Sequence, residues 1–228
     1  MEWSGASSLL QSAEVPDSGS RQEHAGHHGQ EPPHRQLSRT TQLVLASASP
    51  RRQEILARFG LAFSVQPSHV PEQHPPGDAA QAMAAVALAK ARAVARQWAR
   101  PTVVLGADTE VVLDGRYLGK PADIPDAVRM LRALRGRTHE VITGVALVEA
   151  PEGREETAAV VTRVTMTNAT DEDIAAYVAT GEPLDKAGAY AVQGQGSRLI
   201  AHIDGCYTNV VGLPVETTRR LLQRWGLL

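Results

Sequence analysis

Two adjacent arginines follow a pair of serines where a short apolar segment gives way to a helical pattern. Residues 47–52 read SASPRR, from Ser47 to Arg51 and Arg52. Serine followed by proline is typical of a helix start, and the free N–H groups there bind anions, as do hydroxyls and guanidiniums. We therefore expect a phosphate site. An ordinary helix cap with solvated arginines is the alternative, because the glycine spacing of a Walker A or dinucleotide-binding loop is missing.

A carboxylate follows a second apolar segment. Residues 102–105 read TVVL and predict a strand, after which Gly106 leads to Asp108 and Thr109. A carboxylate at the carboxyl end of a strand in an α/β sheet can hold Mg²⁺ or orient an attacking water. An aspartate that only caps the end of the strand is the alternative.

Two lysines stand where they could supply further positive charge. Lys120 lies between a glycine and a proline, and the proline fixes the backbone beside it. Lys90 lies in an alanine-rich helical pattern at 79–97, and on the inner face of that helix it would need an anionic partner. The alternatives are a Lys90 whose ammonium extends to the surface and a Lys120 that is simply solvated. Glu72, in the loop before this helix, is a further carboxylate.

A glycine-rich segment, DKAGAYAVQGQG, occupies residues 185–196. Its glycines permit a close approach of the backbone, and the amide of Gln193 offers both a donor and an acceptor to the edge of a base. A tight structural turn is the alternative. His139 and His202 stand isolated in strand patterns, and we interpret both as structural.

The composition excludes several classes of protein. The 228 residues carry 23 Lys and Arg against 25 Asp and Glu, so no basic excess favours stable binding of nucleic acid. No apolar run approaches the ~18 residues of a membrane span, so we expect no membrane insertion. A single cysteine and an N-terminus without a secretory signal pattern predict a cytoplasmic protein.

The chain divides into two parts. Residues 1–40 are rich in Ser, Gln, Gly, Pro and His without helical or strand periodicity, and we predict a disordered N-terminal tail. Residues 41–228 are predicted to form one α/β domain, a mixed central sheet flanked by helices, because strand and helix patterns alternate. The predicted strands are 43–45, 62–66, 102–105, 111–113 with 117–118 as a hairpin, 141–147, 158–167 and 198–203; the helices are 50–59, 79–97, 123–135, 171–179 and 214–224.

Six short blocks follow one another along this domain: SASPRR at 47–52, GADT at 106–109, GKP at 119–121, THEV with TGV within 138–145, DKAGAY with QG within 185–194, and NVVGLP at 209–214. In this order they resemble the Maf family, the homologues of a septum-formation inhibitor, which are nucleoside triphosphate pyrophosphatases. The resemblance covers residues 42–225 and implies a Maf/ITPase-like architecture.

The resemblance also implies an activity and a set of roles. The family hydrolyses a nucleoside triphosphate to its monophosphate and pyrophosphate with a divalent cation, Mg²⁺ or Mn²⁺, in a cytoplasmic homodimer. Its proton acceptor falls on Asp108, and Glu72 is the second carboxylate for the cation. Lys90 and Lys120 add positive charge, while Ser47 lines the phosphate site with Arg51 and Arg52. Whether Asp108 is a base, a metal ligand or both stays open.

Substrate choice in the family resembles a readout at three positions, here Arg51, Thr109 and Gln193. This set is similar to the subgroup that acts on dTTP and UTP; hydrolysis of 7-methyl-GTP is the alternative specificity. A nucleotide-sensing regulator of cell division that binds without turnover is the alternative function. One departure from the family pattern is Glu110, where an apolar residue is usual, and we expect its side chain to point out of the strand.

Overall fold

The computed structural model describes residues 41–71, 77–151 and 153–228. The predicted tail of residues 1–40 and the candidate carboxylate Glu72 lie outside these ranges. A mixed seven-stranded sheet forms the centre of the domain, with the strand order β2-β1-β3-β5-β6-β7 and with β4 paired to β3. Its strands are β1 (Gln42–Leu45), β2 (Phe63–Val65), β3 (Thr102–Leu113), β4 (Arg116–Tyr117), β5 (Thr138–Ala150), β6 (Glu155–Met166) and β7 (Ile200–Asp204).

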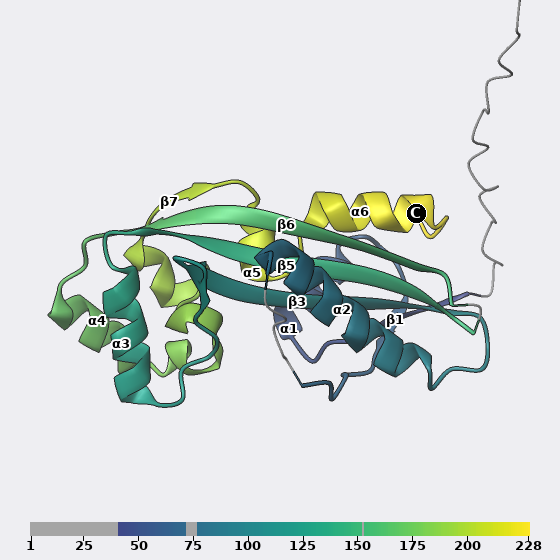
Figure 1. The fold of residues 1–228 in the computed structure, drawn as a ribbon, viewed down its shortest axis with the longest axis horizontal. Coiled ribbons are helices and arrows are strands. Elements are labelled where there is room, and N and C mark those ends of the chain that lie inside the picture. Colours follow the sequence, from purple (N-terminus) through teal and green to yellow (C-terminus); the bar gives the residue numbers. More distant parts are fainter. Residues whose placement is uncertain (1–40, 72–76, 152) are drawn as a thin grey trace, which may run out of the picture. The chain divides into compact units, whose positions relative to one another are not determined.

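Helices cover both faces of the sheet (Figure 1). They are α1 (Pro50–Ala57), α2 (Ala79–Ala95), α3 (Ile124–Leu134), α4 (Asp171–Val178), α5 (Tyr207–Val211) and α6 (Val215–Arg224). Helix α2 packs on one face, where Ala87 and Ala91 meet Val104. Helices α1 and α6 pack on the opposite face, where they share a core with Leu105. Within the described ranges, no helix is both long and apolar enough to cross a membrane.

The approach of α2 to the sheet is unusually close at two glycines. A Cβ atom on Gly106 of β3 would lie 2.3 Å from the carbonyl oxygen of Ala87, and one on Gly144 of β5 would lie 2.0 Å from that of Met83. Neither strand position can therefore carry a side chain. The alanines of α2 complete this fit, since a small side chain lets the helix backbone approach the sheet.

The sheet has an open edge beside β3. Strand β1 runs parallel to β3 only as far as the pair Leu45 and Leu105, after which the chain turns away into α1. Further along β3, strand β4 pairs with the same edge, beginning at Val112 of β3. Residues 106–111 thus form a notch, in which β3 is paired on one side with β5 and lacks a neighbouring strand on the other. We call this stretch the β3 notch.

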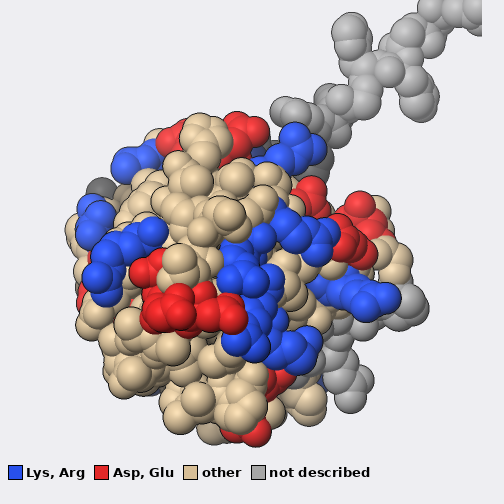
Figure 2. Space-filling model, turned by 90° about the vertical axis from the view of Figure 1, so that its left-hand side faces the viewer, with Lys and Arg blue, Asp and Glu red and all other residues tan. Residues whose placement is uncertain are grey.

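Helices α3 and α4 lie together at one end of the sheet (Figure 1). Arg132 of α3 and Arg135, which directly follows that helix, form ion pairs with Asp171, the first residue of α4. Thr170 closes the start of α4 through a reciprocal capping box with Asp173. Figure 2 views this end, where basic and acidic side chains lie next to one another. The ion pairs of Asp171 join α4 to α3 at this end.

Most predicted elements are confirmed, with bounds that shift by a few residues. The strand predicted to end at 105 is wrong, because β3 continues to Leu113. Gly106 does not end the strand: pairing with β5 continues through Val112, and the glycine serves the contact with α2. Strands β5 and β6 are likewise longer than predicted, and the short helix α5 was not predicted.

The glycine contact predicts a large loss of stability on a minimal substitution. Gly144→Ala should lower the free energy of unfolding by about 2 kcal/mol or more, because the new methyl group overlaps the backbone of α2. Urea unfolding measures this change. Ala175→Ser, on the exposed side of α4, should change it by less than about 0.5 kcal/mol. Equal stability of Gly144→Ala and the unaltered protein would contradict the close packing of α2.

Candidate active site

A buried ion pair lies in the β3 notch. Lys90 of α2 places its Nζ 2.5 Å from Oδ1 of Asp108, and the two residues are only 7% and 4% exposed. The alternative of a Lys90 that extends to the surface is therefore wrong. A carboxylate and an ammonium can be buried together at tolerable cost only when they are paired. The close contact of α2 with the sheet is what brings these two charges together.

The expectation for Glu110 is wrong. It is 5% exposed, so its side chain does not point into solvent. Its Oε1 accepts hydrogen bonds from the backbone N–H groups of Val111 and Gly119, at 2.9 and 3.0 Å. The carboxylate thus satisfies polar backbone groups at the open edge of β3 and fixes the turn that carries Lys120. These contacts were invisible in the sequence because Gly119 lies nine residues away.

Arg52 is a structural clamp beside the notch. Its Nε donates to the carbonyl oxygen of Gly212, and its two terminal nitrogens donate to the hydroxyls of Ser47 and Thr109. Ser47 also accepts from the backbone N–H of Ser49. Ser49 takes the N-cap position of α1 without a capping bond from its hydroxyl. Arg52 therefore ties the start of α1 to β3 and to the loop after α5.

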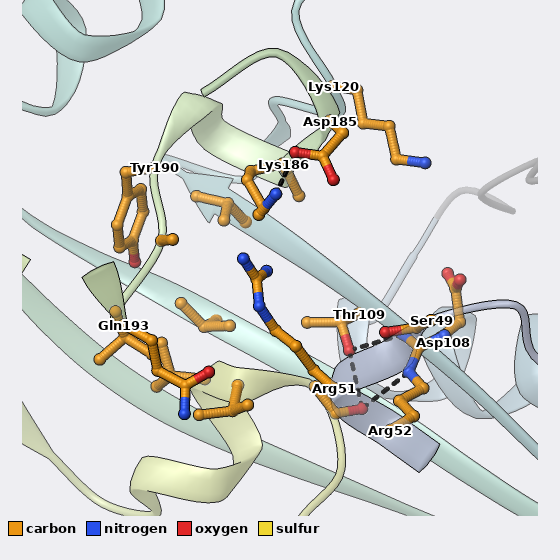
Figure 3. A pocket seen from close by; sticks show the side chains of 18 residues that line it. Ser49, Arg51, Arg52, Asp108, Thr109, Lys120, Asp185, Lys186, Tyr190 and Gln193 are labelled. Carbon is orange, nitrogen blue, oxygen red and sulfur yellow. Dashed lines mark hydrogen bonds and ion pairs between the residues drawn. The ribbon is translucent and has the colours of Figure 1, made fainter. Parts of the chain in front are cut away.

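Arg51 points the other way, into a pocket above the notch. Figure 3 shows its side chain extending across the pocket, with Asp185 and Lys186 on one side and Tyr190 and Gln193 on the other. Arg51 makes no hydrogen bond or ion pair to any residue within the described ranges. Its positive charge contributes to lowering the pKa of Asp185, where burial acts in the opposite direction and the hydrogen bond from Lys186 is the main lowering cause.

The pocket consists of two adjoining cavities that share Ser49, Arg51, Arg52, Lys120, Asp185 and Lys186. The first cavity also holds Asp108, Thr109 and the segment from Tyr190 to Gln193, together with valines of β3, β5 and α5. The second also holds Ser47 and Lys90. We call them the amide cavity and the cationic cavity. Ammonium and guanidinium groups line both cavities, and the amide cavity adds apolar side chains and the amide of Gln193.

Glu182 holds the glycine-rich segment in place. Its carboxylate accepts hydrogen bonds from the backbone N–H groups of Gln195 and Gly196 and from the hydroxyl of Tyr177. Burial alone would raise the pKa of Glu182, but these hydrogen bonds outweigh it and lower the pKa. Nearer the notch, the N–H of Gly188 donates to the carbonyl oxygen of Gly119. The segment that carries Gln193 is thus anchored on both sides of the pocket.

Residues 42–225 match the family model described as Maf-like protein. The chain belongs to the Maf-like family. It is 55% identical to the dTTP/UTP pyrophosphatase of Moorella thermoacetica over 190 residues, which cover 82% of this chain and 96% of that protein. It is 51% identical to the dTTP/UTP pyrophosphatase of Koribacter versatilis over 187 residues, covering 82% and 95%.

A solved structure, the nucleoside-triphosphatase or dITP/XTP pyrophosphatase of Mycobacterium abscessus, aligns with 81% of this chain and 94% of its own. Its TM-score is 0.41 and its sequence identity is 15%. A likeness this distant carries no information about the site.

The Maf-like chain brings together nearly all the residues predicted for its site. Ser47, Arg51, Arg52, Lys90, Asp108, Thr109, Lys120 and Gln193 all line one of the two cavities. Glu72 lies outside the described ranges, so its role as a metal ligand stays a prediction. Asp185, Lys186 and Tyr190 were not assigned individual roles from the sequence. Their signal was present, since all three stand in the glycine-rich segment that was singled out.

The described residues offer no complete cage to a metal. No group of three His, Cys, Asp or Glu side chains with metal-binding geometry occurs in the described part of the Maf-like chain. Oδ1 of Asp108 is engaged by Lys90, while Oδ2 has no hydrogen-bond partner among the same residues, and Asp108 lines the amide cavity. Mg²⁺ commonly takes one or two carboxylates, waters and substrate phosphates, so this oxygen fits such an ion.

His139 lies under Tyr190, and burial lowers the pKa of His139 to about 4. Its Nε2 lies 2.7 Å from the hydroxyl of Tyr190. In the unfolded chain this side chain has a pKa of about 6.5 and binds a proton as the pH falls below that value. In the folded protein it stays neutral until the pH approaches 4. Folding stability is therefore complete above pH 6.5 and declines as the pH falls toward 4.

Between pH 7 and pH 5, we expect the free energy of unfolding of the unaltered protein to fall by about 2 kcal/mol more than that of His139→Gln. Urea unfolding at the two pH values measures the difference. His202→Gln, which alters an exposed histidine of β7, serves as the control and should keep the full pH dependence. If His139→Gln shows the same dependence as the unaltered protein, His139 is not buried in its neutral form.

Proposed function

We propose that this protein hydrolyses dTTP and UTP to their monophosphates and pyrophosphate. The observation that carries the proposal is the joined pair of cavities: cationic side chains line both, and one of them also holds apolar side chains, the amide of Gln193 and the buried carboxylate of Asp108. A nucleoside triphosphate has the same division, with four negative charges at one end and a base at the other. The names of relatives about half identical over most of the chain support the same reaction.

The positions of the charges suit attack by water on the α-phosphorus. Asp108 lines the amide cavity and is paired with Lys90, which lines the cationic cavity, and it accepts the proton of the attacking water through its second oxygen. The ammonium of Lys90 compensates the buried charge of that carboxylate. Lys120 and Lys186 stand in the cationic cavity, where they meet the negative charge that develops on the departing pyrophosphate.

A divalent cation, Mg²⁺ or Mn²⁺, belongs to this proposal. Asp108 would hold it, with Glu72 as the second carboxylate. When bound, such an ion neutralises phosphate charge and lowers the pKa of a coordinated water. Because one carboxylate oxygen is already engaged by Lys90, only the second can serve the ion or the water.

Arg51 separates the two ends of the substrate in this proposal. It reaches the centre of the pocket without a hydrogen-bonding partner among the described residues, so its guanidinium is available to a phosphate. Thr109 and Gln193 line the amide cavity and face the pyrimidine. We further propose that the enzyme works in the cytoplasm as a homodimer, and light scattering of the purified protein measures its oligomeric state.

A nucleotide panel tests the proposal. We expect pyrophosphate release from dTTP and UTP with Mg²⁺ or Mn²⁺, slower release from CTP and GTP, and loss of release with EDTA. In ¹⁸O-labelled water, the label should enter the nucleoside monophosphate and not the pyrophosphate, because the α-phosphorus is attacked.

Other results would replace the proposal. Turnover of 7-methyl-GTP alone would keep the reaction and change the substrate. Nucleotide binding without turnover of any substrate would favour the sensor of cell division. Label in the released pyrophosphate would place the attack at another phosphorus and contradict the role given to Asp108.

A further inference from the structure

A chain of buried hydroxyls and carbonyls runs from Arg52 across the sheet. The hydroxyl of Thr109 accepts a hydrogen bond from Arg52 at 3.0 Å and lies 2.9 Å from the hydroxyl of Thr143 on β5. The hydroxyl of Thr143 in turn donates to the backbone carbonyl of Asn209 in α5, at 3.0 Å. Thr143 and Asn209 are fully buried, so water does not compete for the hydrogen bond between them.

Each hydroxyl has a single proton, and this fixes the direction of the chain. A carbonyl oxygen can only accept, so Thr143 uses its proton on Asn209. Between the two threonines, Thr109 must therefore be the donor. An arginine can only donate, so Thr109 also accepts from Arg52. A second acceptor for the Thr109 proton, the carbonyl oxygen of Gly212 at 3.4 Å, likewise belongs to the protein.

Thr109 is thus left with one unused lone pair and no available proton. It lines the amide cavity, so a ligand there meets an acceptor. Triphosphate oxygens are also acceptors at neutral pH, so a triphosphate oxygen beside the lone pair of Thr109 would be unfavourable. A ligand group at Thr109 must carry a hydrogen. In both dTTP and UTP, the groups that do so are N3–H of the base and the 3′-hydroxyl of the sugar.

Gln193 cannot make the same selection. Its amide presents a donor and an acceptor, and a half-turn of the amide exchanges them. No hydrogen bond from the described residues fixes its orientation. Gln193 can therefore serve uracil, with an oxygen at C4, and cytosine, with an amino group there. Thr109 differs because its proton is committed to the protein.

We infer that Thr143 is a positioning residue for specificity: it commits the Thr109 proton to the protein, so that Thr109 accepts the N3–H of uracil or thymine and rejects cytosine, whose N3 is an acceptor. The inference rests on the proposed function and deepens it. Cytosine would place its N3 acceptor against the lone pair of Thr109 and leave both acceptors without a hydrogen.

The ratio of kcat/KM for UTP to that for CTP tests the role of Thr143. Thr143→Val keeps the shape of the side chain and removes the nearer acceptor of the Thr109 proton. Only the long contact to the carbonyl oxygen of Gly212, at 3.4 Å, then competes with cytosine N3 for that proton. We expect the ratio to fall about three- to tenfold, the worth of one neutral hydrogen bond. Thr143→Ser restores the hydroxyl and should restore the ratio.

Thr102→Val is the matched control. Thr102 is also fully buried on β3, but its hydroxyl donates to the carbonyl oxygen of Arg100 at the far end of the strand. It should leave the ratio unchanged. An unchanged ratio in Thr143→Val, or a ratio in Thr143→Ser as low as in Thr143→Val, would overturn the inference.

Two substrate analogues test the same point on the unaltered enzyme, whatever the stability of the variants. 3-Methyl-UTP lacks the N3–H, and its kcat/KM should fall at least tenfold below that of UTP. 3′-Deoxy-UTP should be hydrolysed about as well as UTP. Loss of activity only with the 3′-deoxy analogue would place the sugar at Thr109 and overturn the inference. Failure of the proposed function is distinct, since the unaltered enzyme would then release no pyrophosphate from UTP.

Discussion

The contact between α2 and the sheet is the constraint on which the site depends. Gly106 and Gly144 leave no room for a Cβ atom, and only this close approach puts the Lys90 ammonium on the Asp108 carboxylate. A charge buried alone would cost several kcal/mol, so each partner makes the other tolerable. The notch exists because β1 turns away at Leu45, which leaves Asp108 beside open space rather than beside a strand.

The site divides into a part that is fixed and a part that is free to meet a ligand. Arg52, Glu110 and Thr109 are held by hydrogen bonds to backbone or to one another before a ligand arrives, and Thr109 keeps a single lone pair for a ligand. Arg51 and Gln193 carry no such bonds among the described residues. A fixed frame with a few uncommitted polar groups lowers the ordering cost of binding.

The local patterns predicted most of the fold and most of the residues that line the pocket. Local signals marked the helices, as the serine followed by proline does at the start of α1. The predictions that failed concern features that depend on contacts between residues far apart in the sequence. The direction of the Glu110 side chain depends on the N–H of Gly119, and the length of β3 depends on pairing with β5. Lys90 could not be assigned to the inner face from its alanine-rich surroundings, because alanine suits both faces of a helix. Helix α5 has five residues, too few for a periodic signal.

The role of Asp108 is tested most directly by comparing UTP hydrolysis and UTP binding in Asp108→Asn and the unaltered enzyme. The amide keeps the shape of the carboxylate and loses its ability to take a proton. The account predicts a fall in kcat of about a thousandfold or more, while UTP still binds. A kcat for Asp108→Asn close to that of the unaltered enzyme would show that the reaction does not run through the carboxylate in the β3 notch.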